Sequence, residues 1–249
     1  MKKTYFSQRR SVRKFSEKPV EDAMLKEILE EAMKAPTTGN IQLYSVIITR
    51  SEEGRRKLAP LHFSQPAATG APVILTVCAD MDRYTRWCEL SHTDAGFDNM
   101  LSFMSAFADA LIYSQQVVTI AENLGLGTCY LGTVTYNAPE IAKLLNLPDL
   151  VIPVACIALG WPESEGEETE RLPLDAIIGE EEYPKFSEEE ILDLYKVKEN
   201  FGPNRKFIEE NGKENLAQVF AEVRYPREMN ETFSAKFLKF LEERGIIKN

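Results

Sequence analysis

The sequence has little of the side-chain chemistry that enzymes most often use. Only two histidines occur among 249 residues, and neither belongs to an HExxH zinc-binding pattern. The GxSxG turn of serine hydrolases and the GxxxxGK(S/T) phosphate loop are absent. Gly125 and Gly127 begin like a dinucleotide-binding fingerprint, but they follow an expected helix, and Tyr130 replaces the third glycine. Either the protein is not an enzyme, or a bound cofactor carries the chemistry while the chain binds and orients it.

Cysteine is also scarce, and the 39 acidic residues outnumber the 29 lysines and arginines. The four cysteines lie in apolar stretches without CxxC spacing, which indicates buried free thiols and neither a disulfide framework nor a zinc site. We therefore expect no metal. The net charge of −10 argues against a general nucleic-acid partner, because such binding needs a dominant basic surface. The cysteines are Cys78, Cys88, Cys129 and Cys156.

Apolar runs long enough for a membrane are missing. The longest charge-free piece of the most apolar segment covers residues 110–121, short of the ~20 residues that a bilayer span needs. The N-terminal Met-Lys-Lys is followed by polar and arginine-rich residues, so no apolar core of a signal peptide follows it. We expect a cytoplasmic protein without a membrane partner.

What the sequence does contain is a long apolar helix at its centre. Residues 100–124 include neither proline nor glycine, and their only charged members are Asp109 and Glu122. A helix that is apolar on nearly every side must be buried, either by the rest of the fold or by a second copy of the chain. The glycines after Leu124 end this helix, and residues 128–131 leave it as a strand. The junction, rich in small residues, suits a cofactor.

The remaining patterns predict alternating helices and strands, followed by a helical extension. A glutamate-rich stretch over residues 163–170 separates a core, residues 1–162, from an extension, residues 163–249, which we expect to wrap on the core within the same domain. Residues 80–98 look like a surface excursion. Apolar runs and capping patterns predict strands at 43–49, 73–79 and 151–159 and helices at 20–35, 52–61, 137–145, 187–199, 213–223 and 228–244. The expected caps include Asn137, with Glu140 three residues later, and Ser187, with Glu190 three residues later.

A basic cluster near the N-terminus is the first candidate binding site. Arg9, Arg10 and Arg13 surround the hydroxyl of Ser11 in an otherwise acidic protein. If residues 8–15 form a helical turn, the arginines converge on one side, and guanidinium groups match phosphate oxygens bidentately. The alternative is a solvated basic terminus.

A small polar loop over residues 36–42 is the second candidate. It runs into a predicted strand and offers backbone N–H groups, hydroxyls and amides to a ligand, although an ordinary turn would look the same. The residues that could contact a ligand are Thr37, Thr38, Gly39, Asn40 and Gln42.

Taken together in this order, the motifs resemble the FMN-dependent nitroreductase family. RRSVRKF, PTTGNIQ, AENLGLGTCYLG and a strand ending in LGWP before RLP are similar to its NADPH-preferring branch of oxygen-insensitive nitroreductases and flavin reductases. The likeness extends from about residue 8 to the C-terminus. It implies an α+β fold with a central, mainly antiparallel sheet flanked by helices, and an obligate homodimer with FMN at the interface. The long central helix would then receive its second buried face from the partner subunit.

The resemblance also implies roles for particular residues. Arg9, Arg10, Ser11 and Arg13 would hold the FMN phosphate and ribityl chain, with Arg171 completing the clamp. The loop residues Thr37, Thr38, Gly39, Asn40 and Gln42 would approach the flavin from the partner. Leu131, Gly132 and Thr133 would pass along the ring edge, and Gln65 would lie over its open face. A reduced basic loop, Asn204 to Lys206, would contact the nicotinamide dinucleotide through Arg205 and Lys206. Thr169 stands where the branch has a lysine.

The implied activity is a ping-pong transfer of two electrons. NADPH or NADH would pass a hydride to flavin N5, and nitroaromatics, quinones or flavins would accept the electrons at the same place, without a catalytic side chain. One alternative is a flavin-binding carrier or sensor with little turnover. Another is a dehalogenase or flavin-cleaving type, in which residues 80–98 would form a lid.

Overall fold

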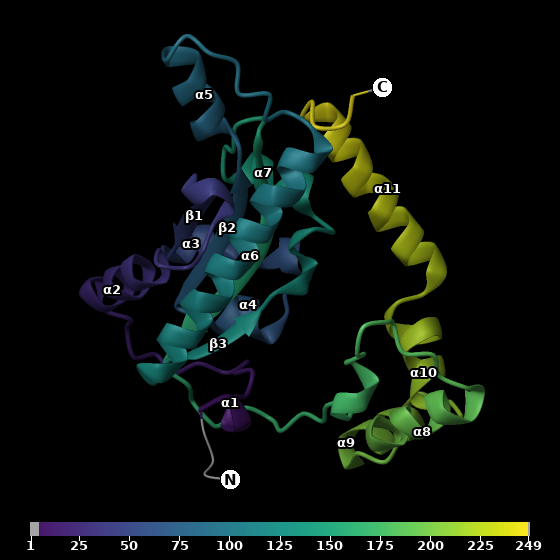
Figure 1. Cartoon of the computed structure of the whole chain (residues 1–249). Helices are drawn as coiled ribbons and strands as arrows, with labels where there is room; N and C mark the ends of the chain where they lie inside the picture. Colours follow the sequence, from purple (N-terminus) through teal and green to yellow (C-terminus); the bar gives the residue numbers. More distant parts are fainter. Residues whose placement is uncertain (1–4, 249) are drawn as a thin grey trace. The chain divides into compact units, whose positions relative to one another are not determined.

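We describe residues 5–248 in a computed structural model of the chain (Figure 1). The chain divides into two compact units. Unit 1 comprises Met1–Glu167 and Phe233–Asn249, and unit 2 comprises Glu168–Thr232. The expected core boundary at residue 162 is near the boundary between the units, but the last part of the expected extension belongs to unit 1. The N-terminal residues considered for a signal peptide lie outside the described part.

Unit 1 is built on an antiparallel sheet, as the α+β expectation required. Its described strands are β1 (Tyr44–Thr49), β2 (Val73–Asp80), β3 (Gly127–Tyr130) and β4 (Val151–Gly160). Their order is β1-β2-β4-β3, and neighbouring strands pair antiparallel throughout. All four predicted strands are thereby confirmed.

The two inner strands are buried on both faces, which explains their continuous apolar sequence. Every residue of β2 and β4 is buried. Because side chains alternate along a strand, Ile74 and Ala158 join a cluster with α3 (Glu52–Leu58), α4 (Pro66–Gly70) and α7 (Ala138–Leu144). Their neighbours Leu75 and Ile157 join a larger cluster on the other face, with α2 (Asp22–Ala32) and α6 (Met100–Asn123). The sheet is thus covered by helices on both sides.

The long central helix predicted from the sequence is α6, which runs along the sheet in Figure 1 and contacts β2 and β4. Asn99 caps it by accepting a hydrogen bond from the N–H of Ser102 at 3.1 Å. One face is buried against the sheet and α2. The opposite face of this single chain exposes apolar side chains, namely Leu101 (79%), Met104 (51%), Leu111 (38%) and Ile112 (45%). Burial on all sides therefore does not occur within one chain.

The excursion at residues 80–98 contains a helix, α5 (Asp82–Leu90). The last helix, α11 (Arg227–Glu243), enters unit 1 at Phe233, and its Phe240 and Leu241 are buried in the core beside Phe103 of α6. The end of the expected extension thus packs on the core. No helix of the described residues is long and apolar enough to cross a membrane.

Two local expectations in unit 1 are wrong. The basic segment does not form a helical turn, because α1 (Tyr5–Gln8) ends before it and the segment runs extended beside the sheet. The N–H of Val12 donates to Thr128 of β3 at 2.9 Å, and Phe15 bridges to Pro162. Asn137 does not cap α7, because its side chain is taken by tertiary partners: it donates to the carbonyl of Leu61 and accepts from Lys236.

Unit 2 is helical, as the extension was expected to be. Helix α8 (Glu188–Glu199) begins with the predicted capping box of Ser187 and Glu190. Helix α10 (Leu216–Gln218) continues into a π-helical turn, Val219–Arg224. The loop expected around Arg205 is instead helix α9 (Gly202–Glu210), which starts with a proline in its first turn. That unit 2 wraps on the core stays a prediction.

Candidate functional site

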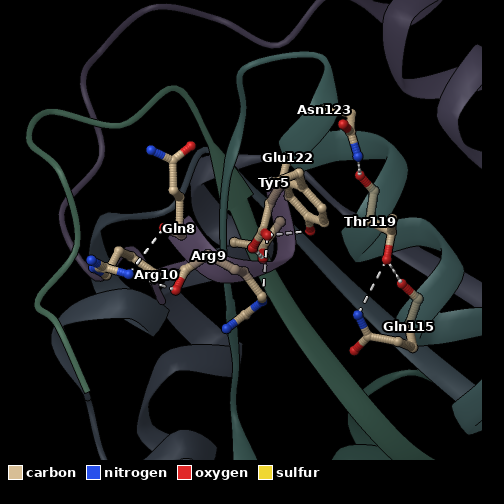
Figure 2. Close-up of polar contacts among 9 residues, drawn as sticks. Tyr5, Gln8, Arg9, Arg10, Gln115, Thr119, Glu122 and Asn123 are labelled. Atoms are coloured by element: carbon tan, nitrogen blue, oxygen red, sulfur yellow. Dashed lines mark hydrogen bonds and ion pairs between the residues drawn. The ribbon is translucent and has the colours of Figure 1, made fainter. Parts of the chain in front are cut away.

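The basic segment lies beside β3 and is tied to α6 by one carboxylate. Arg9 pairs with Glu122 of α6, with 3.4 Å between Nε and Oε2 (Figure 2). The same carboxylate accepts the hydroxyl of Tyr5 at 2.6 Å, and its other oxygen accepts the hydroxyl of Thr128 in β3. Asp109 and Glu122 were identified from the sequence as the only charged residues of the central helix, but the sequence did not indicate their partners.

Arg10 and Arg13 extend this basic surface. Arg10 donates from Nη1 to the carbonyls of Gln8 at 3.1 Å and Arg9 at 3.3 Å. Arg13 is exposed. Burial raises the pKa of the Cys129 thiol in β3, and the positive charges of Arg13 and Arg9 oppose that rise, which indicates that both cations lie near this strand. Ser11 is half-buried. Arg9 and Arg13 are therefore near β3, and Arg10 and Ser11 belong to the same extended segment.

The polar loop is held in place by Asp109, the other charged residue of α6. Asp109 is 2% exposed, and its carboxylate accepts three hydrogen bonds. The donors are the N–H of Thr38 at 2.8 Å, the hydroxyl of Thr38 at 3.0 Å and the N–H of Leu43 at 3.3 Å. A buried carboxylate needs such partners, because its desolvation is otherwise uncompensated.

The loop has an unusual backbone. Gly39 and Asn40 have φ of 57° and Gln42 has φ of 60°, a left-handed region that glycine and asparagine tolerate best. The N–H of Gln42 donates to the hydroxyl of Thr37 at 3.3 Å. A pocket of about 450 Å³ opens beside Gln42 and Tyr44. Ordinary turns can have positive φ as well, so the contact of this loop with a ligand stays a prediction.

The structure brings two further candidate segments together through a histidine that the sequence did not single out. His62 is fully buried, and its Nδ1 lies 2.9 Å from the hydroxyl of Thr133. Gln65 follows three residues later, with its N–H on the carbonyl of His62 at 3.2 Å. Gly132 is exposed, and a Cβ there would meet nothing within 4 Å. The segment of Gln65 and the segment of residues 131–133 thus form one surface, open at Gly132.

An exposed aromatic ring lies next to Gln65 and was also missed from the sequence. Phe63 is 53% exposed and has a φ of 55°. Its ring lies edge-on to Phe233 at 6.2 Å between centroids, and Phe233 stacks on Tyr136 at 4.4 Å. The exposure of Phe63 could not be predicted from the sequence, because apolar residues usually mark core positions.

Burial lowers the pKa of His62 from 6.5 to about 4. In the unfolded chain the imidazole takes up a proton near pH 6.5, whereas the folded site resists it until about pH 4. We therefore expect this residue to remove up to about 3 kcal/mol of unfolding free energy as the pH falls through that interval. Urea unfolding at pH 7, 5.5 and 4 measures this loss.

The variant His62→Gln cannot protonate, so its stability relative to the wild type should improve as the pH falls. His92→Gln removes an exposed histidine and serves as the control. Its free energy of unfolding should depend on pH as that of the wild type does. Parallel profiles for His62→Gln and the wild type would contradict the prediction.

Three predicted site residues belong to unit 2 and are described separately. Arg171 is exposed and donates to the hydroxyl of Thr169 and to the carbonyl of Glu170, both at 2.8 Å. Arg205 and Lys206 are exposed on α9, where Lys206 pairs with Glu210 at 3.6 Å. Their part in a ligand site stays a prediction.

Comparison with known proteins agrees with this architecture. The profile of the nitroreductase family matches residues 6–161. An FMN reductase (NAD(P)H) from Bacillus subtilis is 31% identical over 234 residues, covering 89% of this chain and 92% of the relative. A Cr(VI) reductase from a Pseudomonas species is 30% identical, covering 87% and 90%. A crystal structure from Bacteroides fragilis, described as an oxidoreductase, superposes with a TM-score of 0.95 at 42% identity and covers 98% of this chain and 99% of its own. The chain belongs to the nitroreductase family, which confirms the resemblance of its motifs.

Proposed function

We propose that the protein is an FMN-dependent oxidoreductase that takes electrons from NADPH or NADH and passes them to nitroaromatics, quinones or flavins. The observation that carries this proposal is the placement of Arg9, Arg10, Ser11 and Arg13 in one extended segment beside β3, in a family whose relatives include FMN reductases. The similarity to an oxygen-insensitive NADPH nitroreductase from Salmonella typhimurium, 30% identical over 179 residues, supports the same reaction class.

The residues present fit the phosphate of FMN. Guanidinium groups and a serine hydroxyl supply charge-assisted donors, which are the strongest partners for phosphate oxygens. Gly166 approaches this segment so closely that a Cβ there would lie 2.5 Å from the carbonyl of Ser11 and 2.7 Å from the Cβ of Arg10. There is therefore no room for a side chain at position 166, and any larger residue there would displace the backbone of the basic segment.

The ring of the flavin would lie along residues 131–133. Leu131 is buried and fixed by its N–H on the carbonyl of Cys156 at 2.8 Å, and Gly132 leaves its backbone accessible. Bound FMN would supply the hydride and electron chemistry, whereas this chain's residues bind it, orient it and present donors to its edge. Gln65 and the ring of Phe63 would flank the place where a flat substrate stacks.

We also propose that the functional unit is a homodimer with the FMN at the interface. The apolar face of α6, defined by Leu101, Met104, Leu111 and Ile112, is exposed in one chain although it carries no charge. Residues at this helical spacing form a continuous stripe, and a second copy would bury it. The loop that Asp109 holds would then reach the flavin of the partner. Arg171, Arg205 and Lys206 would complete the phosphate and nucleotide contacts.

The visible spectrum of the purified protein tests the proposal. We expect a flavin spectrum that NADPH or NADH bleaches anaerobically and that a quinone or a nitroaromatic restores. A flavin spectrum that neither nucleotide bleaches would favour a flavin-binding carrier or sensor. A colourless protein that cannot be reconstituted with FMN would contradict the proposal, and comparison of the two nucleotides would decide the donor.

A further inference from the structure

We infer that Glu122 is the residue that orients Arg9 toward the flavin phosphate, and that the protein's preference for a phosphorylated flavin depends on it. This inference rests on the proposed FMN site and adds to it a positioning residue on the central helix. The two residues are 113 positions apart in the sequence, so only the fold joins them.

The geometry of the contact is what suggests the role. Glu122 meets Arg9 at Nε, the nitrogen nearest the side-chain stem, and not at the two terminal nitrogens. Figure 2 shows the end of the guanidinium group directed away from the carboxylate. Among residues 5–248, no hydrogen bond or ion pair engages those terminal nitrogens. Their N–H groups form the fork that binds phosphate oxygens bidentately, and the fork is thus left available.

The carboxylate is itself held firmly. Its side chain is only 8% exposed, compared with 23% for Arg9. Tyr5 and Thr128 donate to its two oxygens, so it is fixed from α1 and from β3 at once. Burial is the main cause that raises the pKa of Tyr5 to about 12, and the hydrogen bond to Glu122 is the second. This phenol therefore stays a donor at neutral pH. A fixed carboxylate beside Nε restricts the rotamers of Arg9, so the side chain loses less conformational entropy when it binds a phosphate.

A simple alternative is that Glu122 competes with phosphate for Arg9 and weakens binding by repulsion. The two roles predict opposite results, because removal of a repelling carboxylate should improve the binding of FMN. The arrangement favours orientation, since the contact occupies Nε only and leaves the fork free.

The experiment compares FMN with riboflavin, which lacks the phosphate. Dissociation of FMN on dilution of the holoenzyme, followed by flavin fluorescence, gives one affinity, and competition with added riboflavin gives the other. For Glu122→Leu, which removes the acceptor, we expect the preference for FMN over riboflavin to fall by about tenfold. Glu122→Gln keeps an acceptor oxygen at the same place, so it should recover part of that preference.

Three comparisons make the result specific. A defect of folding alone would weaken both flavins equally and leave their ratio unchanged, which would overturn the inference. In an Arg9→Met background, Glu122→Leu should have no further effect on the ratio. Glu89→Gln, an exposed carboxylate on α5, removes the same charge elsewhere and should leave the ratio at the wild-type value.

The remaining outcomes separate this inference from the proposed function. A higher preference for FMN in Glu122→Leu would establish repulsion and overturn the positioning role, although FMN would still be the cofactor. A wild-type protein that binds both flavins equally would likewise overturn it. A wild-type protein that binds neither flavin would overturn the proposed function itself.

Discussion

Replacement of Asp109 by alanine is expected to lower the free energy of unfolding by about 3 kcal/mol and to abolish most of the reductase activity. The carboxylate is buried in α6 and accepts hydrogen bonds from two backbone N–H groups and one hydroxyl. The alanine variant leaves the N–H of Leu43, a buried residue, without its acceptor, and an unsatisfied buried donor carries the full desolvation cost. Urea unfolding and steady-state NADPH oxidation measure the two effects.

The activity should fall because Asp109 holds the strained loop of Thr37 to Gln42, the segment expected to reach the flavin of the partner. Glu27→Ala is the matched control, because it removes an exposed carboxylate from α2, the helix packed beside α6. It should change the stability by less than about 0.5 kcal/mol. Wild-type stability and turnover in Asp109→Ala would show that the loop does not depend on this anchor.

The second large effect is expected at the apolar face of α6. We predict that Ile112→Glu converts a dimeric protein into a monomer that retains little FMN. A charged group buried in an apolar interface costs several kcal/mol unless it is paired, and a twofold symmetric contact brings the same substitution into the interface twice. Ile112 is 45% exposed in the single chain, so the change should not disturb the core of the protomer.

Sedimentation velocity gives the oligomeric state, and the flavin-to-protein absorbance ratio gives the occupancy. Ile112→Val keeps the face apolar and should remain a dimer with its flavin. The prediction fails if Ile112→Glu sediments with the wild type as a dimer, or if the wild type is itself a monomer at micromolar concentration.

Local sequence patterns predicted most elements of unit 1 because each pattern is read within one segment. The strands β2 and β4 are continuous apolar runs, and their burial on both faces of the sheet explains why no alternation appears. Helix α6 was predicted with its limits nearly correct, since Asn99 precedes it and Gly125 follows it. The capping box of α8 was likewise recognisable from Ser187 and Glu190.

The errors occurred where a distant partner overrode a local pattern. The arginine-rich segment was treated as a possible helical turn, but the carbonyl of Thr128 takes the N–H of Val12 and draws the chain along β3. Asn137 looked like a helix cap, but Leu61 and Lys236 occupy its side chain. Around Arg205 the resemblance to the family implied a loop, whereas the residues form helix α9, with Pro203 in its first turn.

The sequence by itself determined the family and the long central helix, because these follow from contiguous motifs and from apolar patterns within single segments. The antiparallel α+β sheet was implied by the resemblance to the family. The sequence also identified Asp109 and Glu122 as the only charged residues of the central helix. Only the tertiary structure decided what they meet: Asp109 holds Thr38, 71 residues away, and Glu122 accepts from Tyr5, 117 residues away. His62 meets Thr133 in the same way, 71 residues apart. Such pairs depend on the order of the strands and on the path of each connection, and no local pattern contains that information.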